Sequence, residues 1–206
     1  RQNPNDAQAH FILGFTYGNL GQHQKAIVSF EEAIRIKPDH ANAQYKLGLI
    51  YKKGKGVPQD LKEAFKWLRL AADQGNAKAQ FHLGGMYAQG KGVPQDLKET
   101  VKWIRLSAEQ GFAKAQLSLG HKYKNGEGVL QDIKEAVKWY RLAADQGYAL
   151  AQRFLGMMYK KGQGVCLYKD NTKLERLDSR EILFGSSVRL LYCNRKLDNA
   201  PKFPID

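Results

Sequence analysis

The stretch Asn76–Gly111, NAKAQFHLGGMYAQGKGVPQDLKETVKWIRLSAEQG, decides the fold, because the chain repeats most of it before and after. Its Leu-Gly pair recurs with a period of 36 residues, and a tyrosine follows each glycine by three positions. The glycines of these pairs are Gly48, Gly84, Gly120 and Gly156. A fixed period of this length predicts a solenoid, in which each repeat buries its apolar face only against its neighbours.

Within one repeat, capping residues predict two helices joined by a glycine-rich turn. Asn76 is a good N-cap for a first helix, and Gly90 suits the left-handed conformation that ends a helix. Asp96, with Glu99 three residues later, has the pattern of a capping box, so a second helix begins there. That helix ends near Gly111. Each repeat is therefore expected to be an antiparallel helix pair.

The first part of the chain follows a shorter spacing, which is carried by Leu13, Gly14, Tyr17, Ala26, Phe30, Ala33 and Pro38. This pattern resembles the tetratricopeptide (TPR) repeat, with His10 where that repeat prefers tryptophan. Arg1–Pro4 resembles the end of a preceding TPR repeat. We therefore expect the chain to be a piece of a longer array.

A second pattern covers residues 39 to 165. Its motifs are Ala77–Gln80, Leu83-Gly84, Met86-Tyr87, Gly90–Val93, Gln95-Asp96, Lys98-Glu99, Trp103 and Gln110-Gly111. On these motifs the region resembles the Sel-one-like repeat family, relatives of TPR repeats with a longer turn between their two helices. The resemblance implies an all-α fold, a right-handed α-solenoid superhelix of antiparallel helix pairs. Members of this family are mostly adaptor and scaffold proteins, and they are common in bacteria.

The two patterns divide the chain into units. We expect the end of a TPR unit at 1–4, a TPR repeat at 5–38, Sel-one-like repeats at 39–75, 76–111 and 112–147, and a partial one at 148–165. The pattern stops after Val165. Residues 166–206 are expected to be a divergent tail, disordered or non-native, and the alternative is a folded native cap over the helix at 149–161.

The composition favours an acidic partner, because the formal net charge is +13. No apolar run reaches the length of about 18 residues that marks a membrane-spanning helix. Cys166 and Cys193 match no metal spacing, and no nucleophile–base motif is present, so we expect no enzymatic activity, metal or cofactor. The compartment stays open: cytoplasmic, or periplasmic or secreted if a signal peptide precedes Arg1.

Two recurring motifs have both a chemical and a structural interpretation. The Lys-Trp-x-Arg boxes around Trp67, Trp103 and Trp139 interleave basic and aromatic residues, as single-strand nucleic-acid sites do. Helical spacing instead places the tryptophans on the apolar stripe and pairs Arg69 with Asp73 on a solvated face, so nucleic acid is the less favoured partner. The Gly-x-Gly turns lack the third glycine of a dinucleotide site and are interpreted as structural turns.

Alignment with TPR arrays predicts which side chains line the concave surface. The predicted partner-binding residues are aromatic toward the N-terminus and basic or amide toward the C-terminus: Tyr45, Lys52, Lys53, Lys78, Phe81, Gln89, Lys114, His121, Lys124, Asn125, Arg153, Lys160 and Lys161. An alternative is that these residues are only the exposed face of a spacer.

These features predict a non-enzymatic protein-interaction scaffold. It would bind an extended, acidic or amphipathic segment of a protein partner in its concave groove, with Tyr45 and Phe81 as apolar anchors. The alternative function is binding of an anionic polymer, such as RNA or a cell-wall polymer, driven by the net charge. End-to-end self-association is a further expectation, because uncapped solenoid ends expose apolar surface.

Overall fold

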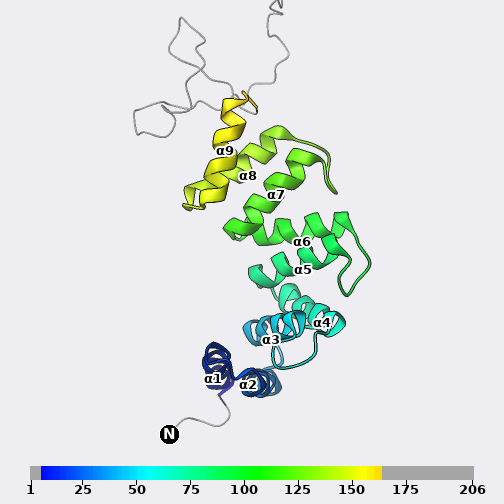
Figure 1. The fold of residues 1–206 in the computed structure, drawn as a ribbon, viewed down its shortest axis with the longest axis vertical. Coiled ribbons are helices and arrows are strands. Elements are labelled where there is room, and N and C mark those ends of the chain that lie inside the picture. Colours follow the sequence, from blue (N-terminus) through cyan, green and yellow to red (C-terminus); the bar gives the residue numbers. More distant parts are fainter. Residues whose placement is uncertain (1–5, 164–206) are drawn as a thin grey trace, which may run out of the picture.

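The computed structural model describes residues 6–163, and this part of the chain is helical throughout, without strands (Figure 1). The helices are α1 (Ala7–Asn19), α2 (His23–Ile36), α3 (Ala41–Lys53), α4 (Leu61–Asp73), α5 (Ala77–Gln89), α6 (Leu97–Glu109), α7 (Ala113–Asn125), α8 (Ile133–Asp145) and α9 (Ala149–Lys160). Each helix packs mainly on the helices before and after it, and the pairs stack along the long axis. The predicted all-α solenoid of helix pairs is confirmed. The interpretations of residues 166–206 lie outside the described residues.

The predicted helix ends are present in the structure. The Asn76 side chain accepts a hydrogen bond from the backbone N–H of Ala79 at 2.9 Å, and Gly90 ends α5 in the left-handed conformation, with φ of 63°. Asp96 accepts from the backbone N–H groups of Lys98 and Glu99 at 2.8 and 3.0 Å. These side chains satisfy amides that a helix N-terminus leaves without partners.

The predicted capping box is only half formed. The backbone N–H of Asp96 donates to the carbonyl oxygen of Tyr87 at 3.1 Å, so it does not need the Glu99 carboxylate. Glu99 instead accepts from Lys102 Nζ at 2.8 Å and from Trp103 Nε1 at 2.9 Å. The glutamate of this motif therefore holds the tryptophan of its own helix in place.

In the three repeats of the Sel-one-like pattern whose two helices are both described, the glycine of the Leu-Gly pair marks the place where those helices cross. A Cβ atom at Gly84 would lie 2.8 Å from Ile104 Cγ1 and 3.1 Å from the carbonyl oxygen of Thr100. Gly48 and Gly120 are equally confined by the second helices of their own repeats. Only a residue without a side chain allows this approach, which explains the glycine at this point of the period.

The Gly-x-Gly turns after α3, α5 and α7 join the two helices of one repeat and also pack against the preceding repeat. Gly92 has a φ of 75°, and a Cβ atom there would overlap the carbonyl oxygen of Leu61, the first residue of α4. Gly128 has the same relation to Leu97 at the start of α6. The structural interpretation of these turns is confirmed, and the second glycine is needed because the turn presses on the backbone of the preceding repeat.

Buried glutamines join three helices at two of the repeat boundaries. Gln80 is 4% exposed, and its Nε2 donates to the carbonyl oxygen of Ala72 in α4 at 3.1 Å. Its Oε1 accepts from Nε2 of Gln110, the C-cap of α6, at 2.7 Å. Gln116 makes the corresponding bonds one repeat later. Both the nitrogen and the oxygen of this buried amide have hydrogen-bond partners. A shift of one helix along another would break these bonds at a cost in free energy, so the glutamine fixes how the three helices are aligned.

The adjacent residues Gly84 and Gly85 test the close approach of the two helices. We expect Gly84→Ala to lower the free energy of unfolding by about 1–3 kcal/mol, because the methyl group overpacks the crossing. Gly85 has no atom within 4 Å of a Cβ, so Gly85→Ala is expected to stabilise the chain by about 0.5–1 kcal/mol through helix propensity. Urea unfolding followed by circular dichroism measures both changes, and equal effects at the two positions would contradict this interpretation.

A second pair of glycines separates backbone strain from contact between repeats. Gly75 and Gly92 both have positive φ, but only Gly92 faces the preceding repeat. We expect Gly75→Ala to cost about 1–2 kcal/mol, the strain of a left-handed residue. Gly92→Ala is expected to cost more, because overlap with Leu61 adds to the same strain. A comparison of the two urea midpoints checks this, and a Gly75 variant as unstable as the Gly92 variant would refute it.

Candidate functional site

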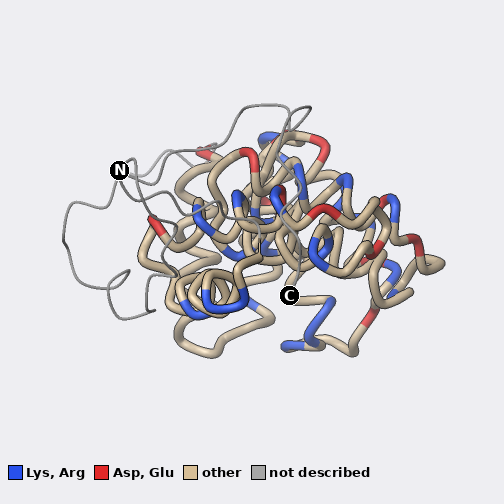
Figure 2. Tube along the Cα trace, turned by 90° about the horizontal axis from the view of Figure 1, so that it is seen from above, with Lys and Arg blue, Asp and Glu red and all other residues tan. Residues whose placement is uncertain are grey.

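Positive charge gathers on the first helices of the repeats. Within residues 6–163, Lys122 of α7 is the one first-helix lysine that forms an ion pair, with Glu127 in the turn after α7 at 2.7 Å. Helices α1, α3, α5, α7 and α9 contain no aspartate or glutamate, and all but α1 contain lysine or arginine. Carboxylates of the second helices form ion pairs with basic residues of the same helix, as in Glu63–Lys66, Arg69–Asp73 and Glu99–Lys102. Figure 2 shows that basic positions outnumber acidic ones along the trace. The excess charge therefore belongs to the surface that the first helices form.

His82 in α5 lies at the centre of this charge. Burial, with smaller contributions from Lys52, Lys53 and Lys114, lowers its pKa to about 4. Lys52 Nζ lies 3.5 Å from His82 Nδ1. An imidazole in this setting stays neutral near pH 7, because a proton on it would face several ammonium groups.

The lysines around His82 also lower one another's pKa values. Burial lowers the pKa of Lys52, and Lys91 and Lys53 add to the effect. The pKa of Lys46 is lowered by burial and then by Lys78 and Lys53. No carboxylate offsets these shifts. We call the residues Lys46, Lys52, Lys53, Lys78, His82, Lys91 and Lys114 the basic cluster; it spans α3, α5, α7 and the turn after α5.

The structure places four of the predicted binding residues together in the basic cluster: Lys52, Lys53, Lys78 and Lys114. Tyr45 lies beneath it, 9% exposed, with its ring stacked on His82 at a centroid distance of 5.8 Å. Phe81 is half-buried between His82 and Phe112, at 5.6 and 5.4 Å. Tyr45 thus offers little surface to a ligand and instead supports the rings above it.

The remaining predicted residues lie away from His82. Gln89 is exposed at the end of α5, and His121 packs edge-on against Phe154 at 4.5 Å, with Nδ1 3.0 Å from the carbonyl oxygen of Leu117. The others lie on or next to α7 and α9, the first helices of the last two repeats: Lys124, Asn125, Arg153, Lys160 and Lys161. The predicted surface is therefore a basic cluster with a less dense basic continuation.

Three members of the basic cluster were missed in the sequence: Lys46, His82 and Lys91. Lys46 and His82 occupy the same position of the period, two residues before the glycine, which was not among the positions predicted to line the concave surface. Lys91 lies between the glycines of a turn that was considered only for its backbone. Lysine or histidine at these positions is the signal in the sequence that identifies all three.

The side chains of the Lys-Trp-x-Arg boxes make contacts that stabilise the fold. Trp103 and Trp139 are 4% and 8% exposed, which confirms their place on the apolar stripe. Arg69 pairs with Asp73 at 2.9 Å, as predicted. Arg105 differs: its Nη2 donates to the hydroxyl of Tyr123 in the next repeat at 2.7 Å. The boxes join repeats rather than present aromatic faces for stacking with bases.

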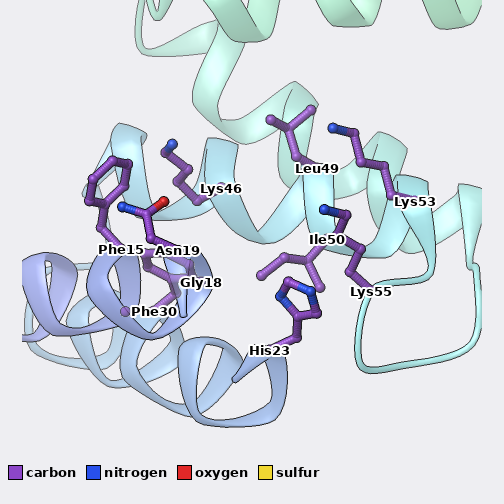
Figure 3. A pocket seen from close by; sticks show the side chains of 11 residues that line it. Phe15, Gly18, Asn19, His23, Phe30, Lys46, Leu49, Ile50, Lys53 and Lys55 are labelled. Atoms are coloured by element: carbon purple, nitrogen blue, oxygen red, sulfur yellow. The ribbon is translucent and has the colours of Figure 1, made fainter. Parts of the chain in front are cut away.

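A cleft of about 280 Å³ lies between α1, α2 and α3 (Figure 3). Its apolar lining comes from Phe15, Phe30, Leu49 and Ile50, and its basic lining from Lys46, Lys53 and Lys55. Lys46 Nζ lies 4.6 Å from the centre of the Phe15 ring. Because Lys46 and Lys53 also belong to the basic cluster, the cleft continues that surface toward the N-terminus.

The described part of the chain contains neither a metal-ligand cluster nor a membrane-spanning helix. Residues 6–163 contain no group of three or more His, Cys, Asp or Glu side chains placed to hold a metal ion. None of the nine described helices is both long enough and apolar enough to cross a bilayer.

Comparisons with known proteins agree with this architecture. The family model described as Sel1 repeat matches residues 41–76, 77–112, 113–148 and 149–173. Models described as TPR repeat and tetratricopeptide repeat match residues 19–54 and 1–28. No curated protein sequence matches the chain. The unit boundaries inferred from the sequence stay a prediction.

Solved structures include similar solenoids. A protective antigen of uropathogenic Escherichia coli with an SLR fold is 41% identical, with a TM-score of 0.73 over 78% of this chain and 35% of that one. A Sel1 repeat protein of Oxalobacter formigenes is 32% identical, with a TM-score of 0.72 over 79% and 66%. Cysteine rich protein B of Helicobacter pylori, 24% identical with a TM-score of 0.51 over 64% and 93%, shares the fold. The chain spans about a third of the first protein and 66% of the second. By its repeats and its helix pairs, this chain belongs to the Sel1 repeat family.

Proposed function

We propose that the chain is a non-enzymatic scaffold that binds an extended acidic segment of a partner protein along its first helices. Sel1 and TPR repeats are typical of protein–protein interaction and are generally non-catalytic. The observation that carries the finer proposal is the basic cluster, in which lysines of neighbouring repeats surround His82 without carboxylates. A bound acidic segment would supply the missing negative charge.

The cluster would contribute both to the rate of encounter and to affinity. A single exposed ion pair is worth only about 0–1 kcal/mol. Several cations on one surface create a field that steers an acidic partner and raises the association rate. Lys52 and Lys46 are half-buried, so part of their desolvation is already complete before binding. Carboxylates that reach them would gain more than they would at a fully hydrated lysine.

Other side chains would extend this contact. Phe81 is half-buried and adds apolar area beside the cluster, where it packs edge-on against His82 and Phe112. The amides of Gln89 and Asn125 are exposed, and they can pair with the backbone of an extended segment. Further along, His121, Lys124, Arg153, Lys160 and Lys161 would continue the basic path.

An anionic polymer is the second candidate, favoured by the net charge of +13. RNA or a cell-wall polymer would bind mainly through release of counterions, so its affinity would fall steeply with salt. Docking of a protein segment would depend less on salt and more on particular side chains. Titrations at several salt concentrations, with and without nuclease, separate the two candidates.

The charge proposal is tested by two double variants that change the net charge equally. Lys78→Glu/Lys114→Glu reverses charge in the basic cluster, whereas Lys62→Glu/Lys98→Glu reverses exposed lysines on α4 and α6. For a fluorescein-labelled glutamate-rich peptide, we expect the first pair to lower affinity about tenfold or more and the second to change it about twofold or less. Fluorescence anisotropy measures both. Equal losses in the two variants would refute a specific surface and favour a response to net charge alone.

The depressed pKa of His82 provides a second test. A carboxylate bound beside Lys52, Lys53 and Lys114 would stabilise the protonated imidazole and raise its pKa from about 4 toward the ordinary 6.5. Between these two values the complex would hold more protons than the free chain, so binding is expected to take up protons and to strengthen as the pH falls toward 5. Calorimetry in buffers with different heats of ionisation measures the uptake. Proton uptake that persists unchanged in His82→Gln would show that the peptide binds elsewhere.

A further inference from the structure

The cleft between α1, α2 and α3 is a distinct feature at the junction of the TPR repeat with the first Sel1 repeat. Phe30 closes its floor at 2% exposed, and the half-buried Leu49 and Ile50 line the α3 side. Phe15 stands at the α1 side with 44% of its surface exposed. The exposed Phe15 ring lies beside the buried Phe30 without apolar cover of its own, and an apolar side chain of a ligand can provide that cover.

The cleft exists because one side chain is missing. Gly18 lies four residues after Gly14, the same position that Lys52 holds relative to Gly48 in the next repeat. A Cβ atom at Gly18 would meet only the Ala26 methyl group, at 3.9 Å, so the space beside it is open. The turn after α3 supplies the far edge, where Lys55 lies, and Gln24 at the start of α2 donates a hydrogen bond to the carbonyl oxygen of Gly56 in that turn.

The rim of the cleft is basic and has no acidic partner. Lys46, Lys53 and Lys55 all line it, and no carboxylate within residues 6–163 forms an ion pair with any of them. Lys46 lies over the Phe15 ring, and its pKa is lowered by burial and by Lys78 and Lys53. The cleft therefore combines an apolar interior with an uncompensated positive edge.

We propose that this junction cleft takes one large apolar side chain, phenylalanine or leucine, that is flanked by carboxylates in the bound segment. The inference rests on the proposed function and adds a sequence requirement to it. The volume of about 280 Å³ lies just below the range of small-molecule sites, about 300–1,000 Å³, and suits one side chain. Phe15, Leu49 and Ile50 contact that side chain, and Lys46, Lys53 and Lys55 bind the flanking carboxylates.

The apolar side chain in the junction cleft, which we call the anchor, also sets the register of the whole bound segment. Lys46 and Lys53 belong to both the cleft and the basic cluster, so a segment anchored at the junction continues directly past His82 toward Lys114. A partner of this chemistry has one apolar residue near one end of an acidic run. An acidic run without that residue binds the cluster in many registers and more weakly.

The test compares two fluorescein-labelled peptides that differ in one residue. Both are glutamate-rich, and one carries a phenylalanine where the other carries a serine. We expect the full chain to bind the phenylalanine peptide about tenfold more tightly or better, the gain from burying one large apolar side chain. Gly18→Leu fills the cleft and is expected to bring this ratio close to one. The control Lys134→Leu adds the same side chain at an exposed site on the second helix α8, away from the cleft and the basic cluster, and keeps the ratio, because the lost charge acts on both peptides alike.

The outcomes distinguish the two levels of the proposal. If both peptides bind equally to the unaltered chain, and charge reversal at Lys78 and Lys114 weakens both, the apolar anchor is overturned while binding of an acidic segment by the basic cluster stands. If neither peptide binds, the proposed function fails and the anchor with it. Phe15→Ala is a second variant, which removes one wall without adding bulk and is also expected to reduce the ratio. A ratio that survives in both cleft variants places the apolar contact elsewhere and overturns the inference.

Discussion

The two helices of a Sel1 repeat come close together because the first helix has no side chain where they cross. At Gly84 the second helix leaves no room for a Cβ atom, since Ile104 and the backbone of Thr100 occupy that space. This contact sets the distance between the helices, and the distance in turn sets the place of the following turn. The turn then reaches the preceding repeat, where Gly92 lies against the backbone of Leu61. The hydrogen bonds of Gln80 to Ala72 and Gln110 join α4, α5 and α6, and they depend on the same stacking.

The stacking separates charge between the two sets of helices. On the second helices, Glu63, Glu99 and Glu135 accept from nearby lysines, and the latter two also hold the indoles of Trp103 and Trp139. These carboxylates are therefore engaged within their own helices. The first helices have none, and their lysines face one another across the repeat boundaries around His82. A surface of this kind is costly to leave unoccupied and is well suited to an acidic segment.

Features within one repeat were predictable from the sequence, whereas contacts between repeats were not. The cap at Asn76, the stop at Gly90 and the buried position of Trp103 follow from local chemistry and helical spacing. The bond from Arg105 to Tyr123 and the two-sided bonding of Gln80 join residues whose relative position depends on how repeats stack. The burial of Tyr45 has the same origin, because His82 of the next repeat covers it. Among the residues of the basic cluster, the spacing identified most of the lysines but not the histidine between them.

The central claim is that an acidic segment binds to the first helices, along the basic cluster. The most direct measurement is a titration of the isotope-labelled full chain with a glutamate-rich peptide, followed by amide chemical shifts. The account predicts that the shifts change in α3 and α5 and at the start of α7, around Lys53, His82 and Lys114, while α4, α6 and α8 change little. Changes concentrated on the second helices, or none at a peptide concentration that saturates binding, would contradict it.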